Sequence, residues 1–401
     1  MPVMRRTARR AGLAAVAAGF LAAGCASAAP AARTAAAPAP VPASPMDTAV
    51  TTADGTWAVA VMGGSAAQDN DFWQLFVRPA GAAAWKLVTP PGTADNGGLI
   101  VAGGSGSGLI TAFRPSQLLT YTPLSRTDDG GRAWSALSPL DAALASAPGA
   151  LALQPAGRLL ALTTRGTAEQ STGGQAEAGS LTWTTLATTR ALAATPAGRR
   201  CGLAGLTAAA YTPAGQPLLA GACTRAGTVG IFAQQGGTWT PAGPPLPASL
   251  AGQAITVLRL ATTGNQTVAL LQAGRGSAAR LLAAWTAGPG SRWTTSPPLR
   301  LGRAALASAS LGPAGTVAVL TTGAVLTTGG RAALLTAPGA AWRALPAVPP
   351  GTATLAPGAA GETDALAVHR GTLAVWRLPA AATAWTRAQT ITVPILYGSS
   401  N

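Results

Sequence analysis

The chain has few charged or chemically reactive side chains for its 401 residues: 10% are charged, one is His, and Cys and Tyr occur three times each. A structural zinc site needs about four Cys, His or carboxylate ligands close together, and the sequence contains no Cys/His cluster. A serine-hydrolase triad would have to use His369, the only histidine, and no Gly-x-Ser-x-Gly motif accompanies it. We therefore expect no metal, no cofactor and no catalytic triad.

Long uninterrupted segments are also scarce, because 50 Gly and 32 Pro punctuate the chain. Both residues fit poorly in a helix interior, which excludes a long helical bundle, and their short spacing favours many short strands joined by turns. Disorder is disfavoured as well, since 11 Trp and a hydrophobic content of 48% can form a large core.

The amino terminus has the features of an export signal. Residues 1–10 carry four arginines and no acid, and the uncharged residues 11–24 have the length of a signal-peptide core. The core ends in LAAGC (21–25), which resembles the lipobox of bacterial lipoproteins, although Ala22 stands where that family usually has Leu. The resemblance implies cleavage after Gly24 and acylation of Cys25. The alternative is a general secretory signal cleaved within 26–29.

This interpretation divides the chain into a lipoprotein signal peptide over 1–24, a lipidated Ala/Pro-rich tether over 25–47 and a folded domain over 48–401. An Ala/Pro segment cannot bury a core and should be extended. Two acyl chains anchor a protein stably where one would be marginal. We expect an exported protein on the outer face of the cytoplasmic membrane, attached to lipid through Cys25, with its formal charge reduced from +15 to +11 by removal of the signal arginines.

Tryptophan recurs about every 50 residues through the folded domain. Each copy follows a small or polar turn, and a second Gly-containing turn between two apolar runs precedes several copies. The two turns predict a unit of four short antiparallel strands, A to D, with Trp at the start of strand D. Such units bury their faces by stacking radially, and residues 48–401 have room for seven. The repeated tryptophans are Trp85, Trp134, Trp183, Trp239, Trp293, Trp342 and Trp385.

The sequence therefore predicts an all-β fold, a seven-bladed β-propeller of four-stranded antiparallel blades. Residues 389–397 are expected to form a strand, which either pairs with the first blade or ends a ring that closes by simple packing. We expect a monomer.

One repeat contains a recognisable motif. Residues 127–134 (TDDGGRAW) resemble the Asp-box, or BNR repeat, of sialidase-type propellers and photosystem-assembly-factor-like propellers. The other six repeats lack the aspartate. The resemblance implies a structural role, remote from any catalytic centre, for Thr127, Asp129, Gly131 and Trp134. Asp129 is expected to cap the backbone of the C–D turn, with Trp134 packed beneath it.

The same resemblance raises the alternative of a sialidase-like glycoside hydrolase. Such an enzyme needs an arginine triad, a tyrosine nucleophile with a glutamate, and an acid/base carboxyl group. Glu169 and Glu177 are expected in a loop-like hairpin and Glu362 in a turn, without a tyrosine in a rigid strand nearby. Asp69 and Asp71 are expected in a solvated loop rather than a calcium site. The three tyrosines of the chain are Tyr121, Tyr211 and Tyr397. We therefore interpret the chain as a protein without catalytic activity.

The two cysteines of the folded domain, Cys201 and Cys223, precede a strand A and end a strand B of the fourth unit. Adjacent antiparallel strands can bring such positions within bridging distance, and an exported protein meets oxidising conditions. We expect a disulfide; two buried thiols are the alternative.

Arginines are expected to collect on one face of the propeller, where the B–C and D–A connections lie. A positive rim attracts anions, so we expect an extracellular ligand or protein partner of anionic character and no nucleic acid. Arginines scattered on a solvated face, attraction to the membrane, and an envelope assembly or scaffolding factor are alternatives. The expected rim consists of Arg190, Arg199, Arg200, Arg225, Arg275, Arg300 and Arg303.

Overall fold

The computed structural model describes residues 49–62, 73–90, 99–103, 108–113, 124–136, 150–154, 157–163, 165–172, 182–322, 331–369 and 371–393. All of them belong to the compact unit Pro38–Asn401. The predicted signal peptide, Cys25 and the tether lie outside the described residues, as do Asp69 and Asp71. No helix among the described residues is long and apolar enough to cross a membrane.

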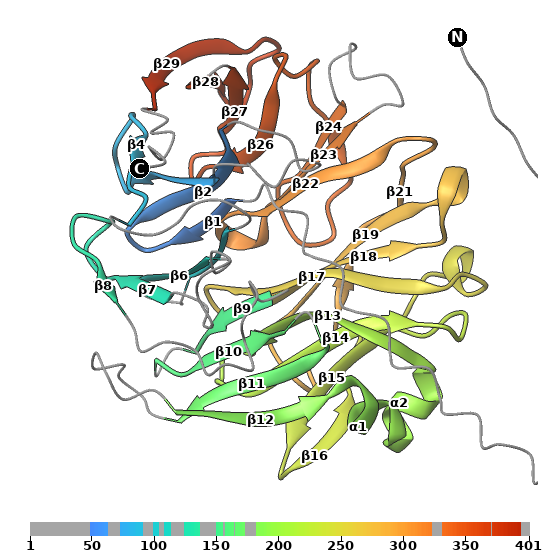
Figure 1. Ribbon diagram of the computed structural model, residues 1–401. Coiled ribbons are helices and arrows are strands. Elements are labelled where there is room, and N and C mark those ends of the chain that lie inside the picture. Colours follow the sequence, from blue (N-terminus) through green and yellow to red (C-terminus); the bar gives the residue numbers. More distant parts are fainter. Residues whose placement is uncertain are drawn as a thin grey trace, which may run out of the picture. The chain divides into compact units, whose positions relative to one another are not determined.

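Three of the described sheets have four strands, and two larger sheets join further units through single pairs of residues. Along the chain, the antiparallel pairs repeat in units of four strands, each built from a continuous part of the chain (Figure 1). Unit 1 contains β1 (Ala49–Thr52), β2 (Gly55–Val61), β3 (Trp73–Pro79) and β4 (Lys86–Leu87). Unit 2 contains β5 (Leu99–Gly103), β6 (Leu109–Phe113), β7 (Leu124–Thr127) and β8 (Ser135–Ala136). Unit 3 contains β9 (Ala150–Leu153), β10 (Leu159–Leu162), β11 (Thr167–Thr172) and β12 (Thr182–Thr188).

The remaining units follow the same order. Unit 4 contains β13 (Leu203–Tyr211), β14 (Pro217–Cys223), β15 (Gly230–Gln235) and β16 (Thr238–Pro241). Unit 5 contains β17 (Ile255–Thr263), β18 (Gln266–Ala273), β19 (Arg280–Thr286) and β20 (Thr294–Thr295), with β21 (Leu299–Arg300) also paired to β19. Unit 6 contains β22 (Ala305–Leu311), β23 (Val317–Thr322), β24 (Arg331–Leu335) and β25 (Arg343–Ala344). Unit 7 contains β26 (Thr352–Pro357), β27 (Thr363–His369), β28 (Thr372–Leu378) and β29 (Thr386–Thr392).

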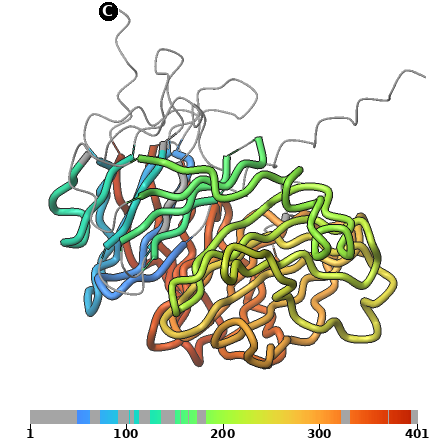
Figure 2. Tube along the Cα trace, turned by 90° about the horizontal axis from the view of Figure 1, so that it is seen from below, coloured from blue at the N-terminus to red at the C-terminus, as the bar shows by residue number. Residues whose placement is uncertain are grey.

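The units form a closed ring, because each pair of consecutive units shares a hydrophobic cluster. The last pair is included: Phe76 and Trp85 of unit 1 belong to one buried cluster with Leu366 and Val375 of unit 7. The blue and red ends of the described chain accordingly lie side by side in both views (Figures 1 and 2). The predicted all-β propeller fold is confirmed. β29 pairs with β28, so units 1 and 7 meet by packing, without exchange of a strand among the described residues.

The repeated tryptophans explain the spacing of the sequence pattern. Each of them packs into the cluster that its unit shares with the preceding unit. Several also donate an indole N–H to a backbone carbonyl of that preceding unit, as Trp293 does to Ala242 and Trp342 to Pro297, both at 2.9 Å. The period of about 50 residues is therefore the repeat of an interface between blades as well as of a strand pattern.

Candidate functional site

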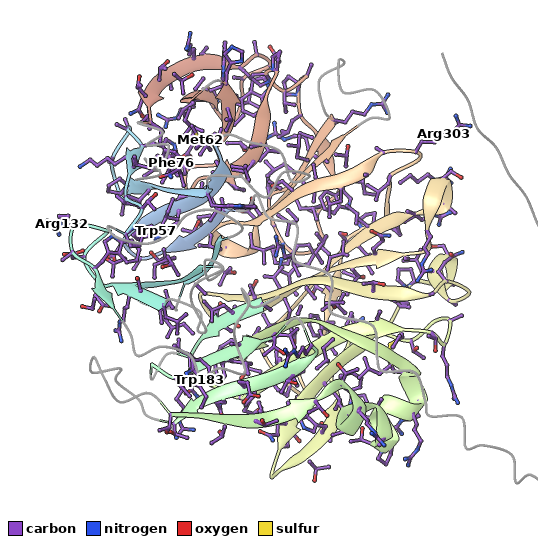
Figure 3. All side chains as sticks on the ribbon, in the orientation of Figure 1. Trp57, Met62, Phe76, Arg132, Trp183 and Arg303 are labelled. Atoms are coloured by element: carbon purple, nitrogen blue, oxygen red, sulfur yellow. A yellow bond between two sulfur atoms is a disulfide. The ribbon has the colours of Figure 1, made fainter. Side chains whose placement is uncertain are left out.

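The ring has two faces with different connections. Because the strands of a unit alternate in direction, A–B and C–D turns lie on one face, and B–C and D–A connections lie on the other. The inner strands point the same way around the ring, as the parallel pairing of β1 and β22 at Val50 and Leu311 illustrates. We call the face of the B–C and D–A connections the arginine face and the opposite face the turn face. In Figure 3, Arg303 of the arginine face lies at the right and Arg132 of the turn face lies at the left.

The structure places all seven arginines of the expected rim on the arginine face. Each is exposed and lies in a B–C or D–A connection, or in a helix or short strand within one. Among the described residues, none of them forms an ion pair with an acid. These arginines are Arg190 in α1, Arg199 and Arg200 in α2, Arg225 and Arg275 in the B–C connections of units 4 and 5, and Arg300 and Arg303 between units 5 and 6.

Two short helices, which the sequence reasoning missed, carry three of these arginines. α1 (Thr189–Ala194) and α2 (Pro196–Cys201) form the D–A connection between units 3 and 4. Threonine side chains accept from backbone amides three residues on and cap both helices. Pro196 opens α2, and Gly202 ends it with φ of 64°. The sequence Thr-Pro-x-x-x-x-x-Gly (195–202) was the available signal.

A disulfide fixes the second helix to the propeller. Cys201 at the end of α2 is bonded to Cys223 at the end of β14, with their Cα atoms 5.1 Å apart. The predicted disulfide is therefore confirmed. Gly230 makes room for it, because a Cβ there would lie 2.9 Å from the sulfur of Cys223. The bond holds the arginine-bearing turn of α2 against unit 4.

A cavity of about 520 Å³ opens on the arginine face between units 5 and 6. Its walls are largely apolar, and its polar side chains come from the end of β18, the B–C connection of unit 5 and the D–A connection that follows. Arg303 is the charged residue of its lining, so the cavity suits a small anion with an apolar part. Its lining includes Leu258, Gln272, Ser277, Leu301, Arg303 and Leu306.

The sequence around these arginines also lacks acids. No Asp or Glu occurs between residues 178 and 361, a stretch that contains twelve arginines. This stretch contains the whole of units 4 to 6, together with β12 of unit 3 and β26 of unit 7. Further exposed arginines extend the arginine face into neighbouring connections: Arg165 in the B–C turn of unit 3 and Arg331 at the start of β24.

One further arginine of this stretch lies in an inner strand of the ring. Burial lowers the pKa of Arg259 in β17 to about 10, which leaves this cation charged at neutral pH.

The acids of the turn face, in contrast, take part in the fold. In residues 127–134, which resemble the Asp-box, Asp129 accepts hydrogen bonds from the backbone amides of Arg132 (2.9 Å) and Ala133 (3.0 Å) and from the Thr127 hydroxyl (2.9 Å). These bonds, that from Ala133 above all, hold the pKa of Asp129 below its usual value. The Thr127 hydroxyl also accepts from the Gly131 amide at 2.9 Å. The motif closes the β7–β8 turn.

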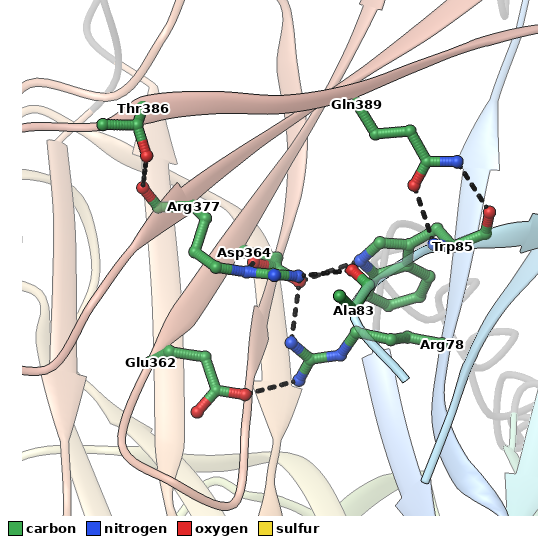
Figure 4. Close-up of polar contacts among 8 residues, drawn as sticks. All are labelled: Arg78, Ala83, Trp85, Glu362, Asp364, Arg377, Thr386 and Gln389. Carbon is green, nitrogen blue, oxygen red and sulfur yellow. Dashed lines mark hydrogen bonds and ion pairs between the residues drawn. The ribbon is translucent and has the colours of Figure 1, made fainter. Parts of the chain in front are cut away.

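The seam between units 1 and 7 contains a group of acids and arginines that contact one another (Figure 4). Asp364 of β27 is fully buried and pairs with Arg78 of β3 (3.0 Å) and Arg377 of β28 (2.8 Å). It also accepts the indole N–H of Trp85 at 2.8 Å. Arg78 makes a further ion pair with Glu362 at 2.9 Å. Paired in this way, the buried carboxylate joins the two ends of the described chain.

Hydrogen bonds between side chains and backbone groups form a second link across the same seam. The side-chain amide of Gln389 in β29 accepts from the backbone amide of Trp85 (2.8 Å) and donates to its carbonyl (2.9 Å). Arg377 also donates to the carbonyl of Ala83 at 2.9 Å. Ion pairs with Asp364 raise the pKa of Arg377. Closure of the ring thus rests on side chains rather than on a shared strand.

The described residues do not assemble the catalytic set of a sialidase. The expectation that Glu169 lies in a loop-like hairpin is wrong: it lies in β11, is 7% exposed and accepts from the Thr185 hydroxyl at 2.9 Å. Strand alternation turns its neighbour Gln170 the other way, where the amide donates to the Tyr211 hydroxyl at 2.9 Å. Burial raises the pKa of Tyr211, which is the opposite of what an activated nucleophile needs.

The other candidates for chemistry stand apart from one another. Glu362 lies in a turn, as expected, and is paired with Arg78. His369 is exposed at the end of β27. In the described part of the chain, no three His, Cys, Asp or Glu residues are grouped so that they could hold a metal ion. Tyr121, Tyr397 and Glu177 lie outside it.

Comparisons with known proteins show similarity in structure only. No family model matches the chain, and no curated protein matches it. Among solved structures, the chain is similar to YCF48 bound to D1 peptide (16% identity, 69% of this chain and 74% of that chain, TM-score 0.37). It is also similar to the propeller of the Trilobed protease from Pyrococcus furiosus (6%, 86% and 96%, TM-score 0.47) and to the Aleuria aurantia lectin with α-methyl-L-fucoside (13%, 77% and 95%, TM-score 0.43). The D1 peptide and the fucoside are ligands of those proteins.

Proposed function

We propose that this protein is a non-catalytic binding propeller that recognises an anionic partner through its arginine face. The observation that carries the proposal is the array of seven exposed arginines in the B–C and D–A connections of units 3 to 6, none of which has an ion pair with a described acid. On the turn face of the same units the exposed described arginines are fewer: Arg158, Arg292 and Arg343. Guanidinium groups bind carboxylate and phosphate in two-pronged geometry, so an array of them favours partners with several anionic groups.

The proposed location of the protein is the outer face of the cytoplasmic membrane. Its support is the sequence of residues 1–25 together with the disulfide, a bond typical of exported proteins. Substitution of Cys25→Ser should release the protein from the membrane or leave its signal uncleaved. A variant that is processed and stays membrane-bound would contradict acylation at this cysteine.

The experiment that tests the binding function compares two triple variants of equal charge. One replaces Arg225, Arg275 and Arg303 of the arginine face with Ser. The control replaces three exposed arginines of the turn face, Arg158, Arg292 and Arg343, with Ser. Binding of fluorescent polyphosphate is measured over a range of salt concentrations.

The first variant should bind more weakly, and its slope of log affinity against log salt should fall by up to about three, roughly one per lost phosphate contact. The control should keep the slope of the unchanged protein. Equal losses in the two variants would mean that net charge alone attracts the polyanion. No binding by the unchanged protein at low salt would contradict the proposed function.

A further inference from the structure

We propose that the partner of the arginine face is an anionic lipid surface, so that the propeller lies with this face on the membrane. The inference rests on the proposed function, because it names the partner of the same face. It adds an orientation, which the binding of soluble anions does not require.

The direction of the first strand supports this orientation. β1 is the innermost strand of unit 1 and, like every strand A of the ring, runs from the arginine face towards the turn face. The described chain begins at Ala49, whose amide donates to the Ser310 hydroxyl of unit 6 at 2.9 Å, so its entry lies at the inner rim of the ring. The first described strand therefore starts on the arginine face, and an anchor that precedes it in the sequence is attached to the domain at this face.

The expected tether is too long to determine the orientation of the domain by itself, so the charges must determine it. An extended Ala/Pro segment between Cys25 and Ala49 would reach roughly 70 Å at about 3 Å per residue. Such a tether permits the domain to touch the membrane or to stand away from it. It also keeps the arginines at a high effective concentration near the lipid, which favours a weak contact over a partner that must be met from solution.

The arrangement of the arginines suits a surface better than a compact ligand. They are distributed over the connections of units 3 to 6. Of the seven, Arg303 alone lines the cavity between units 5 and 6, so a small ligand in that cavity would not contact the others directly. Each basic residue near an anionic membrane strengthens binding by roughly fivefold, and salt screens the attraction within about 10 Å. Because no acid occurs from residue 178 to 361, like charge from the protein does not repel the anionic lipid there.

Two positions of unit 5 allow the orientation to be measured directly. Ser277 lies in the B–C connection on the arginine face, Ser291 lies in the C–D connection on the turn face, and both are exposed. Each is replaced by Cys in the full chain with Cys25→Ser and labelled with a donor fluorophore, since the Cys201–Cys223 disulfide does not react. Vesicles of phosphatidylcholine, with or without phosphatidylglycerol, carry an acceptor in the headgroup region.

With phosphatidylglycerol, the label at position 277 should transfer more energy to the acceptor than the label at position 291, and high salt should abolish the difference. Replacing Arg225, Arg275 and Arg303 with Ser should weaken vesicle binding by about a hundredfold. Equal transfer from the two labels, or more from position 291, would overturn the proposal. If polyphosphate still binds in that case, membrane docking is wrong and the anion-binding function stands. If neither vesicles nor polyphosphate bind, both proposals are wrong.

Discussion

The two faces of this propeller use their charged residues in different ways. On the turn face, Asp129 caps a hairpin, and Asp364 lies at the centre of the seam that closes the ring. On the arginine face, the exposed arginines have no acid among the described residues to pair with. The comparison teaches that a chain with few charges can use its described acids in the fold. The exposed described arginines then remain available to a partner, and they are more numerous on the arginine face than on the turn face.

The largest expected effect lies at the seam. Replacement of Asp364 with Asn removes a fully buried carboxylate and leaves Arg78 and Arg377 without their main partner. Breaking a buried ion pair by removing one member costs about 3–5 kcal/mol. We expect a loss of this size in the free energy of unfolding, measured by denaturant titration. The control is Asp128→Asn, which breaks an exposed pair with Arg126 and should cost less than about 1 kcal/mol. Similar losses in both variants would contradict the role of the seam.

The disulfide should have the next largest effect. Replacing Cys201 and Cys223 together with Ser opens a loop with a sequence separation of 22 and should cost about 3 kcal/mol by the chain-entropy account. The melting temperature of the unchanged protein should fall in reductant, whereas that of the double variant should not respond. Because the exposed arginines remain, polyphosphate binding should change far less than in the arginine-face variant. Loss of all binding would show that the fold, and not charge alone, forms the binding surface.

The smallest effect concerns the Asp-box and depends on pH. The pKa of Asp129 is lowered in the folded protein, so its contribution to stability is present above its unfolded value and is lost as the pH falls through the folded value. Substitution of Asp129→Asn should speed hydrogen exchange of the Arg132 and Ala133 amides, most clearly at neutral pH. Exchange at the arginine face, for example at the amide of Gly227, should not change. An unchanged rate at both turn amides would contradict the capping role.

The regular features of this molecule were readable from its sequence. The spacing of tryptophans and the Gly-containing turns predict the four-stranded units, because each repeat buries the same indole against the preceding blade. Cys201 and Cys223 were predictable from their places on neighbouring strands. The capping of the turn by Asp129 was predictable from the local spacing of residues 127–134, because such spacing determines a local turn.

The features that the sequence did not reveal depend on contacts between distant parts of the chain. Trp85 and Asp364 are separated by 279 residues, and no local pattern marks them as partners. The burial of Glu169 was missed because Ser, Thr and Gln around it suggest a loop, whereas pairing of β11 with β10 and β12 places it in a sheet. Helices α1 and α2 were missed because the repeat pattern assigned the whole domain to strands and turns, although their capping residues are present in the sequence.

The central claim is that the arginine face, and not the turn face, meets an anionic partner. Hydrogen exchange of the full chain with and without polyphosphate tests it most directly, because backbone amides of both faces are compared in one experiment. The account predicts slower exchange in the connections 189–202, 224–229, 274–279 and 301–304 of units 3 to 6. It predicts no change in the turns around Asp129 and Glu362. Slower exchange confined to those turns, or the same change on both faces, would contradict the claim.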